Sequence, residues 1–181
     1  QLTYVRFGCS ALEAYCLEHY DTNDDGGIDV DTEALEVYSI TPSDDTEVSS
    51  LEGIEHFPNL ERVRLLHDSE MNAVDFSQNK KLREIYLPST RLSSLDLSEN
   101  VELDSISLVN TPAITSLDFS SNQELSYIYI NNCQTLTSLN LSENRKLDEL
   151  CCSHCALDDI DVSACEDLRV LLCVNNKMSV L

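Results

Sequence analysis

The sequence predicts a solenoid of stacked parallel β-strands with short turns, in the α/β class, preceded by a small helical cap. A phrase made of an acid or amide, an apolar residue and serine occurs five times, and its first residues fall at positions 75, 96, 118, 140 and 161. A second apolar phrase, such as Leu103-x-x-Ile106-x-Leu108, lies between successive copies. A period of 21 or 22 residues built from two phrases is typical of one repeated scaffold.

The composition limits the classes of partner. The chain has 181 residues, 42% of them hydrophobic, which is enough for one or two domains with a core. Its net charge of −22 repels phosphate backbones and anionic membranes, so we expect no nucleic-acid partner. No apolar run has the length of a membrane span. Because the chain begins at Gln1, we expect a mature form that has lost its signal segment and any lipid anchor.

The N-terminal segment, residues 1–50, does not repeat, and we predict that it forms the cap. Ser10 and Glu13 have the spacing of a capping box, which predicts the start of a helix. Leu12, Tyr15 and Cys16 follow at helical spacing and predict its buried face.

The acidic turn after this helix has the pattern of a calcium-binding loop. Oxygen-bearing side chains at alternate positions precede a glycine, as in EF-hand loops that wrap a hard cation. The twelfth position is Thr32, where a bidentate glutamate is expected, and Glu33 comes one residue late. The loop is therefore either a bulged calcium site or a polar turn that closes the helix. The candidate calcium ligands are Asp21, Asn23, Asp25, Asp29 and Glu33.

The segment between this loop and the repeats has weaker signals. Residues 28–40 alternate well enough for a short strand or a second short helix. Residues 41–50 are polar and acidic, which predicts an exposed loop. The repeats begin at residue 51, so the predicted domains are a cap over 1–50 and a solenoid over 51–181.

Within each phrase the second and third apolar residues lie two positions apart, so both point inward from a strand. One coil cannot bury these side chains alone, whereas stacked coils share a continuous core. Small side chains that can bond backbone groups at turns form two columns, which are Asn79, Asn100, Asn122, Asn144 and Cys165 in one and Thr90, Thr111, Cys133, Cys155 and Asn176 in the other.

The pattern L-x-x-L-x-L-x-x-N/C resembles that of leucine-rich-repeat proteins, especially the nested repeats of about 21 residues in bacterial surface proteins. The leader, from Asp21-x-Asn23-x-Asp25-Gly26 to residues 51–60, resembles the cap before such repeats in exported lipoproteins of Gram-negative gut bacteria. The resemblance implies a leucine-rich-repeat solenoid with an EF-hand-like cap, exported to the cell surface or secreted, and a binding role without catalysis.

The cysteines are interpreted as structural rather than as metal ligands. Cys152 replaces an inward leucine and Cys151 must point outward, so the pair cannot converge on one zinc ion. Cys9 and Cys16 could form a disulfide only if Cys9 lies off the helix, because seven residues of helix separate them too far. The thiols assigned to repeat columns are Cys133, Cys152, Cys155, Cys165 and Cys173.

Two outward columns remain as candidate binding surfaces. The first is the acidic column that opens the repeated phrase, for which we weigh solvation, a turn role and cation binding. The second runs along the other strands and is rich in tyrosine and arginine, which interfaces favour. The residues that we predict to contact a ligand are Arg62, Arg64, Glu84, Tyr86, Tyr127, Tyr129 and Glu149.

The sequence thus predicts a non-enzymatic module at the cell surface or in the medium, which binds a protein or glycan through its repeat face. No convergent acid, base and nucleophile appear, and calcium is the one candidate cofactor. The alternative is a self-assembling unit of a larger surface complex. Its basis is the C-terminal end, where residues 178–181 begin an apolar phrase that stops, which predicts a dimer through an open end or a tail folded over it.

Overall fold

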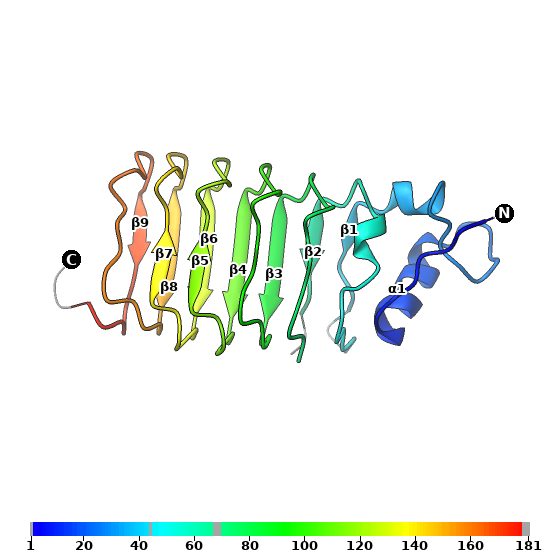
Figure 1. Cartoon of the computed structure of the whole chain (residues 1–181), viewed down its shortest axis with the longest axis horizontal. Coiled ribbons are helices and arrows are strands. Elements are labelled where there is room, and N and C mark those ends of the chain that lie inside the picture. Colours follow the sequence, from blue (N-terminus) through cyan, green and yellow to red (C-terminus); the bar gives the residue numbers. More distant parts are fainter. Residues whose placement is uncertain (1, 44, 67–69, 179–181) are drawn as a thin grey trace.

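The chain forms a row of stacked coils, with the cap at one end and the C-terminus at the other (Figure 1). The structure is a computed structural model, and it describes residues 2–43, 45–66 and 70–178. Within these ranges no helix is long and apolar enough to cross a membrane.

The predicted cap helix is present as α1 (Ser10–Tyr20), and its buried residues are Leu12, Tyr15 and Cys16. The predicted capping box is wrong. The N-cap residue is Cys9, which is extended (φ −147°, ψ 148°), and no side chain caps the helix. Ser10 is already helical, so its hydroxyl is not at the position from which a cap bonds the free amides.

Both alternatives predicted for residues 28–40 occur. A short 3-10 helix, η1 (Glu33–Glu36), precedes a two-residue strand, β1 (Ser39–Ile40). A second 3-10 helix, η2 (Ile54–His56), leads into β2 (Arg62–Arg64), which pairs with β1 in parallel. The cap therefore supplies the first strand of the sheet, and its apolar residues join the core of the repeats.

Seven parallel strands form the main sheet, in the order β1-β2-β3-β4-β6-β8-β9. From β2 onward, successive strands of this sheet come from the same phrase of successive periods, so each occupies the same place in its coil. The remaining strands are β3 (Glu84–Pro88), β4 (Ser105–Val109), β6 (Tyr127–Asn131), β8 (Glu149–Ser153) and β9 (Val170–Leu172).

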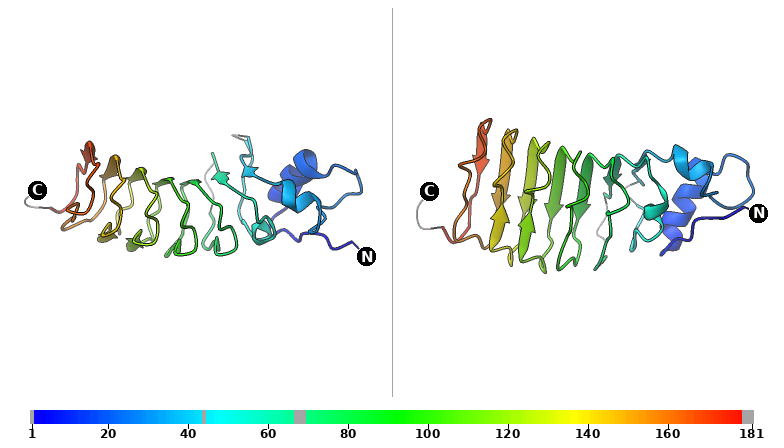
Figure 2. Two further views of the ribbon diagram at one scale, coloured as in Figure 1. Left: turned by 90° about the horizontal axis from the view of Figure 1, so that it is seen from above. Right: turned by 45° about the horizontal axis from the view of Figure 1, so that its top comes forward.

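The repeated acidic phrase lies on the other side of the coils. There, β5 (Ser116–Asp118) and β7 (Ser138–Asn140) form a two-stranded parallel sheet. Figure 2, left, shows the strands of the main sheet along one side and the connecting backbone along the other. The apolar residues of both phrases fill the space between, including the fully buried Phe76 and Phe119. The predicted parallel solenoid is confirmed.

The predicted asparagine column is a buried ladder of hydrogen bonds. The amide nitrogen of Asn122, for example, donates to the carbonyls of Leu97 (2.9 Å) and Asn100 (2.8 Å), one coil back. Each such amide satisfies carbonyls where the backbone turns between the coils. The same arrangement is made by Asn79, Asn100 and Asn144.

A further column of turn residues was not recognised in the sequence. Non-glycine residues follow the main-sheet strands with φ between 49° and 57°, a conformation that asparagine tolerates better than most residues. Neighbours in this column also form hydrogen bonds with one another. For example, Nδ2 of Asn132 donates to Oδ1 of Asn110 (2.5 Å). The column consists of Ser89, Asn110, Asn132, His154 and Asn175.

The last coil is open on the side away from the cap. Leu171 and Cys173 are only half-buried, whereas Leu150 and Cys152, one coil earlier, are fully buried. On the outer side of this coil Leu172 is 51% exposed. Of the unfinished phrase predicted at 178–181, residues 179–181 lie outside the described residues.

Candidate functional site

The exposed face of the main sheet carries two rows of outward side chains, and all seven predicted contact residues lie in them. The strand register places one row in line as Arg62, Glu84, Ser105, Tyr127, Glu149 and Val170. The second row, two residues further along each strand, is Arg64, Tyr86, Ser107, Tyr129, Cys151 and Leu172. The side chains therefore share one surface, and their role in binding stays a prediction.

At the cap-proximal end of this face the predicted residues contact each other. Nε of Arg62 donates to Oε2 of Glu84 (2.6 Å), in an exposed pair that contributes little to stability. The guanidinium of Arg64 lies over the ring of Tyr86, 5.5 Å from its centroid. Both contacts hold long side chains in place along β2 and β3.

Further along the face the surface becomes acidic. Burial, followed by the charge of the neighbouring Glu149, raises the pKa of Tyr127 above its ordinary value. Among the described residues no cation pairs with Glu149. The face is therefore positive at β2 and negative at β8.

A hollow separates these two halves. Its floor is β4, which presents the small side chains of Ser105 and Ser107. The equivalent positions carry glutamate and tyrosine in β3 and two tyrosines in β6. The cavity has a volume of about 470 Å³. We call this hollow, with Tyr86 on one side and Tyr127 and Tyr129 on the other, the tyrosine slot.

The two serines were not among the predicted site residues, although they belong to the same columns. Reading the outward columns for large side chains selects tyrosine and arginine and passes over small residues. The available signal was the alternation of large, small and large residues at positions 86, 107 and 129, one period apart. A gap in a column becomes a cavity only when the strands are in register.

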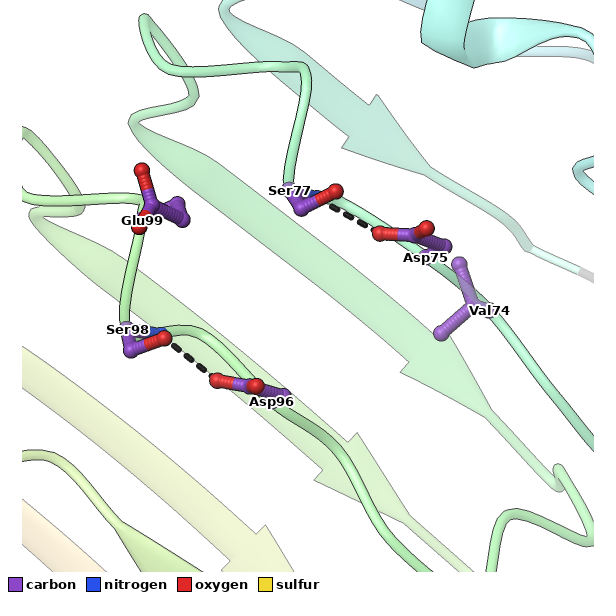
Figure 3. Close-up of a pocket in the computed structure, with 6 residues that line it drawn as sticks. All are labelled: Val74, Asp75, Ser77, Asp96, Ser98 and Glu99. Carbon is purple, nitrogen blue, oxygen red and sulfur yellow. Dashed lines mark hydrogen bonds between the residues drawn. The ribbon is translucent and has the colours of Figure 1, made fainter.

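The acidic column of the repeated phrase is a set of turns. Figure 3 shows the carboxylates of Asp75 and Asp96 directed at the serines of their own phrases, and Asp75 accepts from the amide of Ser77 (2.8 Å). These bonds, from the serine amide and then its hydroxyl, lower the pKa of Asp75 and of Asp96 below the ordinary range. The same turn occurs at Asp118, Asn140 and Asp161.

These turns account for the phrase without a ligand. The cavity between the first two copies, of about 330 Å³, is lined by the same turn residues together with Val74 and Glu99. Asn140 makes the turn with a neutral amide, which shows that the turn does not require a carboxylate. Of the alternatives weighed for this column, the structure therefore favours the turn role.

The candidate calcium loop is closed by its own hydrogen bonds. Oδ2 of Asp21 accepts from the amide of Gly26 (3.0 Å), and Oδ1 of Asn23 accepts from the amide of Asp25 (2.8 Å). Asp29 is buried and caps the following turn by accepting from the amide of Asp31 (3.0 Å). In the described part of the chain, no three acidic, histidine or cysteine side chains converge as a metal site.

Glu33 is held in a structural role. Its Oε1 accepts from the amide (2.7 Å) and hydroxyl (2.9 Å) of Thr22, and its Oε2 accepts from the amide of Asp29 (3.0 Å). Burial would raise the pKa of Glu33, but these amide bonds outweigh it and lower the pKa. Both carboxylate oxygens are thus turned onto backbone amides, which does not fit a bidentate terminal ligand. Of the two alternatives for the loop, the polar turn therefore fits these bonds better, and a calcium titration decides between them.

The cysteines of the described ranges are all free thiols. Cys152 is buried in the core and Cys151 points outward on the same strand, as predicted. Cys9 lies at the end of α1, but its Sγ donates to the carbonyl of Ser50 (3.3 Å) rather than joining Cys16. These positions agree with the structural interpretation.

No protein-family profile and no curated protein matches the sequence. Among solved structures, internalin C2 from Listeria monocytogenes is similar with a TM-score of 0.69 at 18% identity, over 97% of this chain and 88% of that one. The functional domain of InlJ from the same organism, described as including a cysteine ladder, gives 0.62 at 19% identity, over 100% of this chain and 46% of that one. The fold is a leucine-rich-repeat solenoid.

The similarity extends to a more distant solenoid. A chain of the Toll–Spätzle complex from Drosophila matches 72% of this chain and 22% of its own length, with a TM-score of 0.50 at 15% identity. In length, this chain covers less than half of the InlJ domain and most of internalin C2. At these identities the similarity concerns the fold.

Proposed function

We propose that this chain is a non-catalytic module that binds a protein partner through the exposed face of its main sheet. The observation that carries the proposal is the tyrosine slot, a hollow between tyrosines on a rigid parallel sheet. Tyrosine and arginine are enriched at the centres of protein interfaces. Tyrosine buries a large ring with few rotatable bonds, and arginine stacks on rings and donates several hydrogen bonds. A solenoid displays such side chains on an extended surface.

A protein suits this face better than a neutral glycan does. The rows are charged, with arginines at β2 and carboxylates at β3 and β8, and a charged partner gains orientation from this polarity. A sugar would use the tyrosine rings and serine hydroxyls but would leave Arg64 and Glu149 without counter-charges.

We also propose that the module is displayed on the cell surface or secreted, as part of an exported lipoprotein of a Gram-negative gut bacterium. This rests on the resemblance of the repeats and leader to such proteins, and two Listeria internalins share the fold. Protease treatment of intact cells that produce the full-length protein tests the location. Digestion of the repeats without cell lysis is the expected result, and full protection would contradict it.

The binding role is tested by replacing Tyr86, Tyr127 and Tyr129 with alanine. The control removes Tyr4 (42% exposed) and Tyr38 (47%), which are at least as exposed as Tyr127 (37%) but lie outside the strands of the sheet. Each variant and the wild type are used to capture host extracellular proteins and are applied to a glycan array.

We expect captured proteins that depend on the three face tyrosines and not on the control pair. Capture that survives in the face variant would contradict the proposal. Binding only on the glycan array, lost in the face variant, would keep the face and replace the partner class.

A second candidate function is self-assembly, favoured by the open end of the solenoid. The last coil leaves Leu171 and Cys173 only half-buried, and Leu172 of the edge strand β9 (51%) and Val174 after it (58%) are exposed. An unpaired edge strand with apolar side chains is a template for pairing with another chain. In that case the solenoid would act as a structural unit of a larger surface complex.

A further inference from the structure

The spacing of the strands gives the tyrosine slot room for one flat group, and Ser107 at its floor is 8% exposed. Tyr86 and Tyr129 belong to β3 and β6, which are separated only by β4. Adjacent strands lie about 4.8 Å apart, so roughly 9.6 Å separates the strands that bear the two tyrosines. Planar groups in contact need about 3.5–4.0 Å each, so one planar group fits above Ser107 and two do not.

The face already contains a planar cation on one of these rings. Arg64 of β2 lies over Tyr86 at 5.5 Å from the ring centroid. Along the second row the order is therefore arginine, tyrosine, serine, tyrosine. A guanidinium above Ser107 would continue the alternation of cation and ring, and it would lie between Tyr86 and Tyr129.

The charges around the slot also favour a cation at this place. Glu84 borders Ser105 on one side and uses one carboxylate oxygen for Arg62, with no described partner on the other. On the other side of Ser105, the next residues in the row are Tyr127 and then Glu149, which has no described cationic partner. The net charge of −22 adds a long-range attraction for basic partners.

We infer that the tyrosine slot binds an arginine side chain of the protein partner, stacked between Tyr86 and Tyr129 above Ser107. The inference rests on the proposed function and specifies the chemistry of its anchor. Arginine suits the slot better than lysine because its guanidinium is planar, stacks on aromatic faces and bonds carboxylates with several donors.

The test is an NMR titration of the ¹⁵N-labelled whole chain with the peptide acetyl-Gly-Ser-Arg-Ser-Gly-amide, up to ~10 mM. The matched probe carries citrulline in place of arginine, which keeps the shape and removes the charge. We expect saturable shifts at the amides of Ser105, Ser107 and Tyr129, and about tenfold weaker binding of the citrulline peptide.

Two substitutions separate the slot from the acidic surface as a whole. Ser107→Tyr fills the slot with a side chain that both neighbouring strands already carry in that row, and it should abolish the local shifts. Ser116→Tyr adds the same ring on β5, on the other side of the coils, and should leave them unchanged. Thermal melts establish that each variant is folded. If Ser107→Tyr does not fold, Ser105→Tyr replaces it as the variant that fills the slot.

The inference is overturned if the citrulline peptide binds equally, if shifts spread over the acidic surface, or if they persist in Ser107→Tyr. Local shifts from a neutral oligosaccharide with none from the arginine peptide would also overturn it, in favour of a sugar. If protein capture depends on the face tyrosines but the peptide does not bind the slot, only this inference fails. If capture is independent of the tyrosines, the proposed function fails first.

Discussion

At the scale of the residue, two polar side chains in each coil bond backbone groups in the turns between strands. Asp96 accepts the amide of Ser98 (3.0 Å) in a turn, and Asn100 donates to two carbonyls of the preceding coil. These roles explain why short polar residues recur at a fixed spacing within an apolar pattern. The repetition in the sequence therefore records backbone bonding, and the binding chemistry lies in the residues that vary.

The aspartate turns predict a pH dependence. The turn bonds lower the pKa values of Asp75, Asp96, Asp118 and Asp161 in the folded chain below the value of about 3.9 in the unfolded chain. Their stabilisation is complete above that value and is lost as the pH falls through the folded pKa values. Replacing all four with asparagine, which keeps the turn as Asn140 does, should weaken the loss of stability on acidification.

Thermal melts of both proteins from pH 6 to pH 2 measure this dependence. We expect the midpoint of the wild type to fall more than that of the variant over this range. An equal or larger fall in the variant would show that the turns do not favour the ionised carboxylates.

The buried ladder predicts a specific loss of stability for Asn122→Ala. The two carbonyls that Asn122 bonds, of Leu97 and Asn100, also accept backbone amides, so they are not left unpaired. The expected cost is therefore about 2 kcal/mol for two neutral hydrogen bonds, with a cavity contribution in addition. Chemical denaturation measures it, and Gln123→Ala is the exposed control. A loss equal to that of the control would contradict the ladder.

At the scale of the element, the sequence predicted the elements with strong periodicity. The helix over 10–20 and the outward and inward columns follow from spacing alone, because each strand repeats the same alternation. It did not predict that residues 28–40 hold both a 3-10 turn and a strand, since each is too short to show a period. The column of turn residues with positive φ was not predicted either, because serine, histidine and asparagine share no pattern beyond their position after a strand.

The same contrast holds for the candidate site. Large side chains on one face were found from the sequence, but the slot depends on strand register and on what is missing at Ser107. For the cap loop, the pattern Asp21-x-Asn23-x-Asp25-Gly26 showed a turn rich in oxygen ligands. The partners of Glu33 could not be inferred, because they are backbone amides of Thr22 and Asp29 brought together by folding.

The cap predicts a loss of stability for Glu33→Gln. One amide nitrogen of glutamine would face the amide donor of either Thr22 or Asp29, so at least one bond becomes a clash between donors. The buried site makes the expected cost about 1–3 kcal/mol, measured by chemical denaturation. Glu36→Gln, at an exposed position of the same turn, is the control, and equal costs would contradict the structural role of Glu33.

Calcium is tested on the same loop by melts with millimolar calcium and with a chelator. Because the oxygens of Glu33 are engaged by amides, we expect no change in the midpoint. Calcium binding would be shown if calcium raised the midpoint of the wild type and left that of Asp21→Asn unchanged. A ligand that binds only the folded chain stabilises it.

At the scale of the whole molecule, the solenoid has a covered end and an open one. The cap covers the first coil and shares its core, whereas the last coil leaves Leu172 and Val174 half exposed or more. The charge of −22 opposes contact between two copies. Salt screens that repulsion within about 10 Å at 0.1 M, so association through the open end should increase with salt.

Light scattering over a range of protein concentrations and salt tests this association. We expect a mass that rises with both, and a monomeric mass for Leu172→Lys, which places a charge on β9, the edge strand of the last coil. The exposed Val101→Lys, on an outer turn, is the matched control. A wild-type mass that stays monomeric at high concentration and salt would exclude self-assembly through this end.

The measurement that tests the binding face most directly is photo-crosslinking from tyrosine positions. A photoreactive phenylalanine analogue replaces either Tyr127 on the face or Tyr4 on the cap. The two tyrosines are similarly exposed, Tyr127 at 37% and Tyr4 at 42%. With the captured extracellular partner present, we predict crosslinks from position 127 and none from position 4. Crosslinks from position 4 alone, or equally from both, would contradict the main sheet as the binding surface.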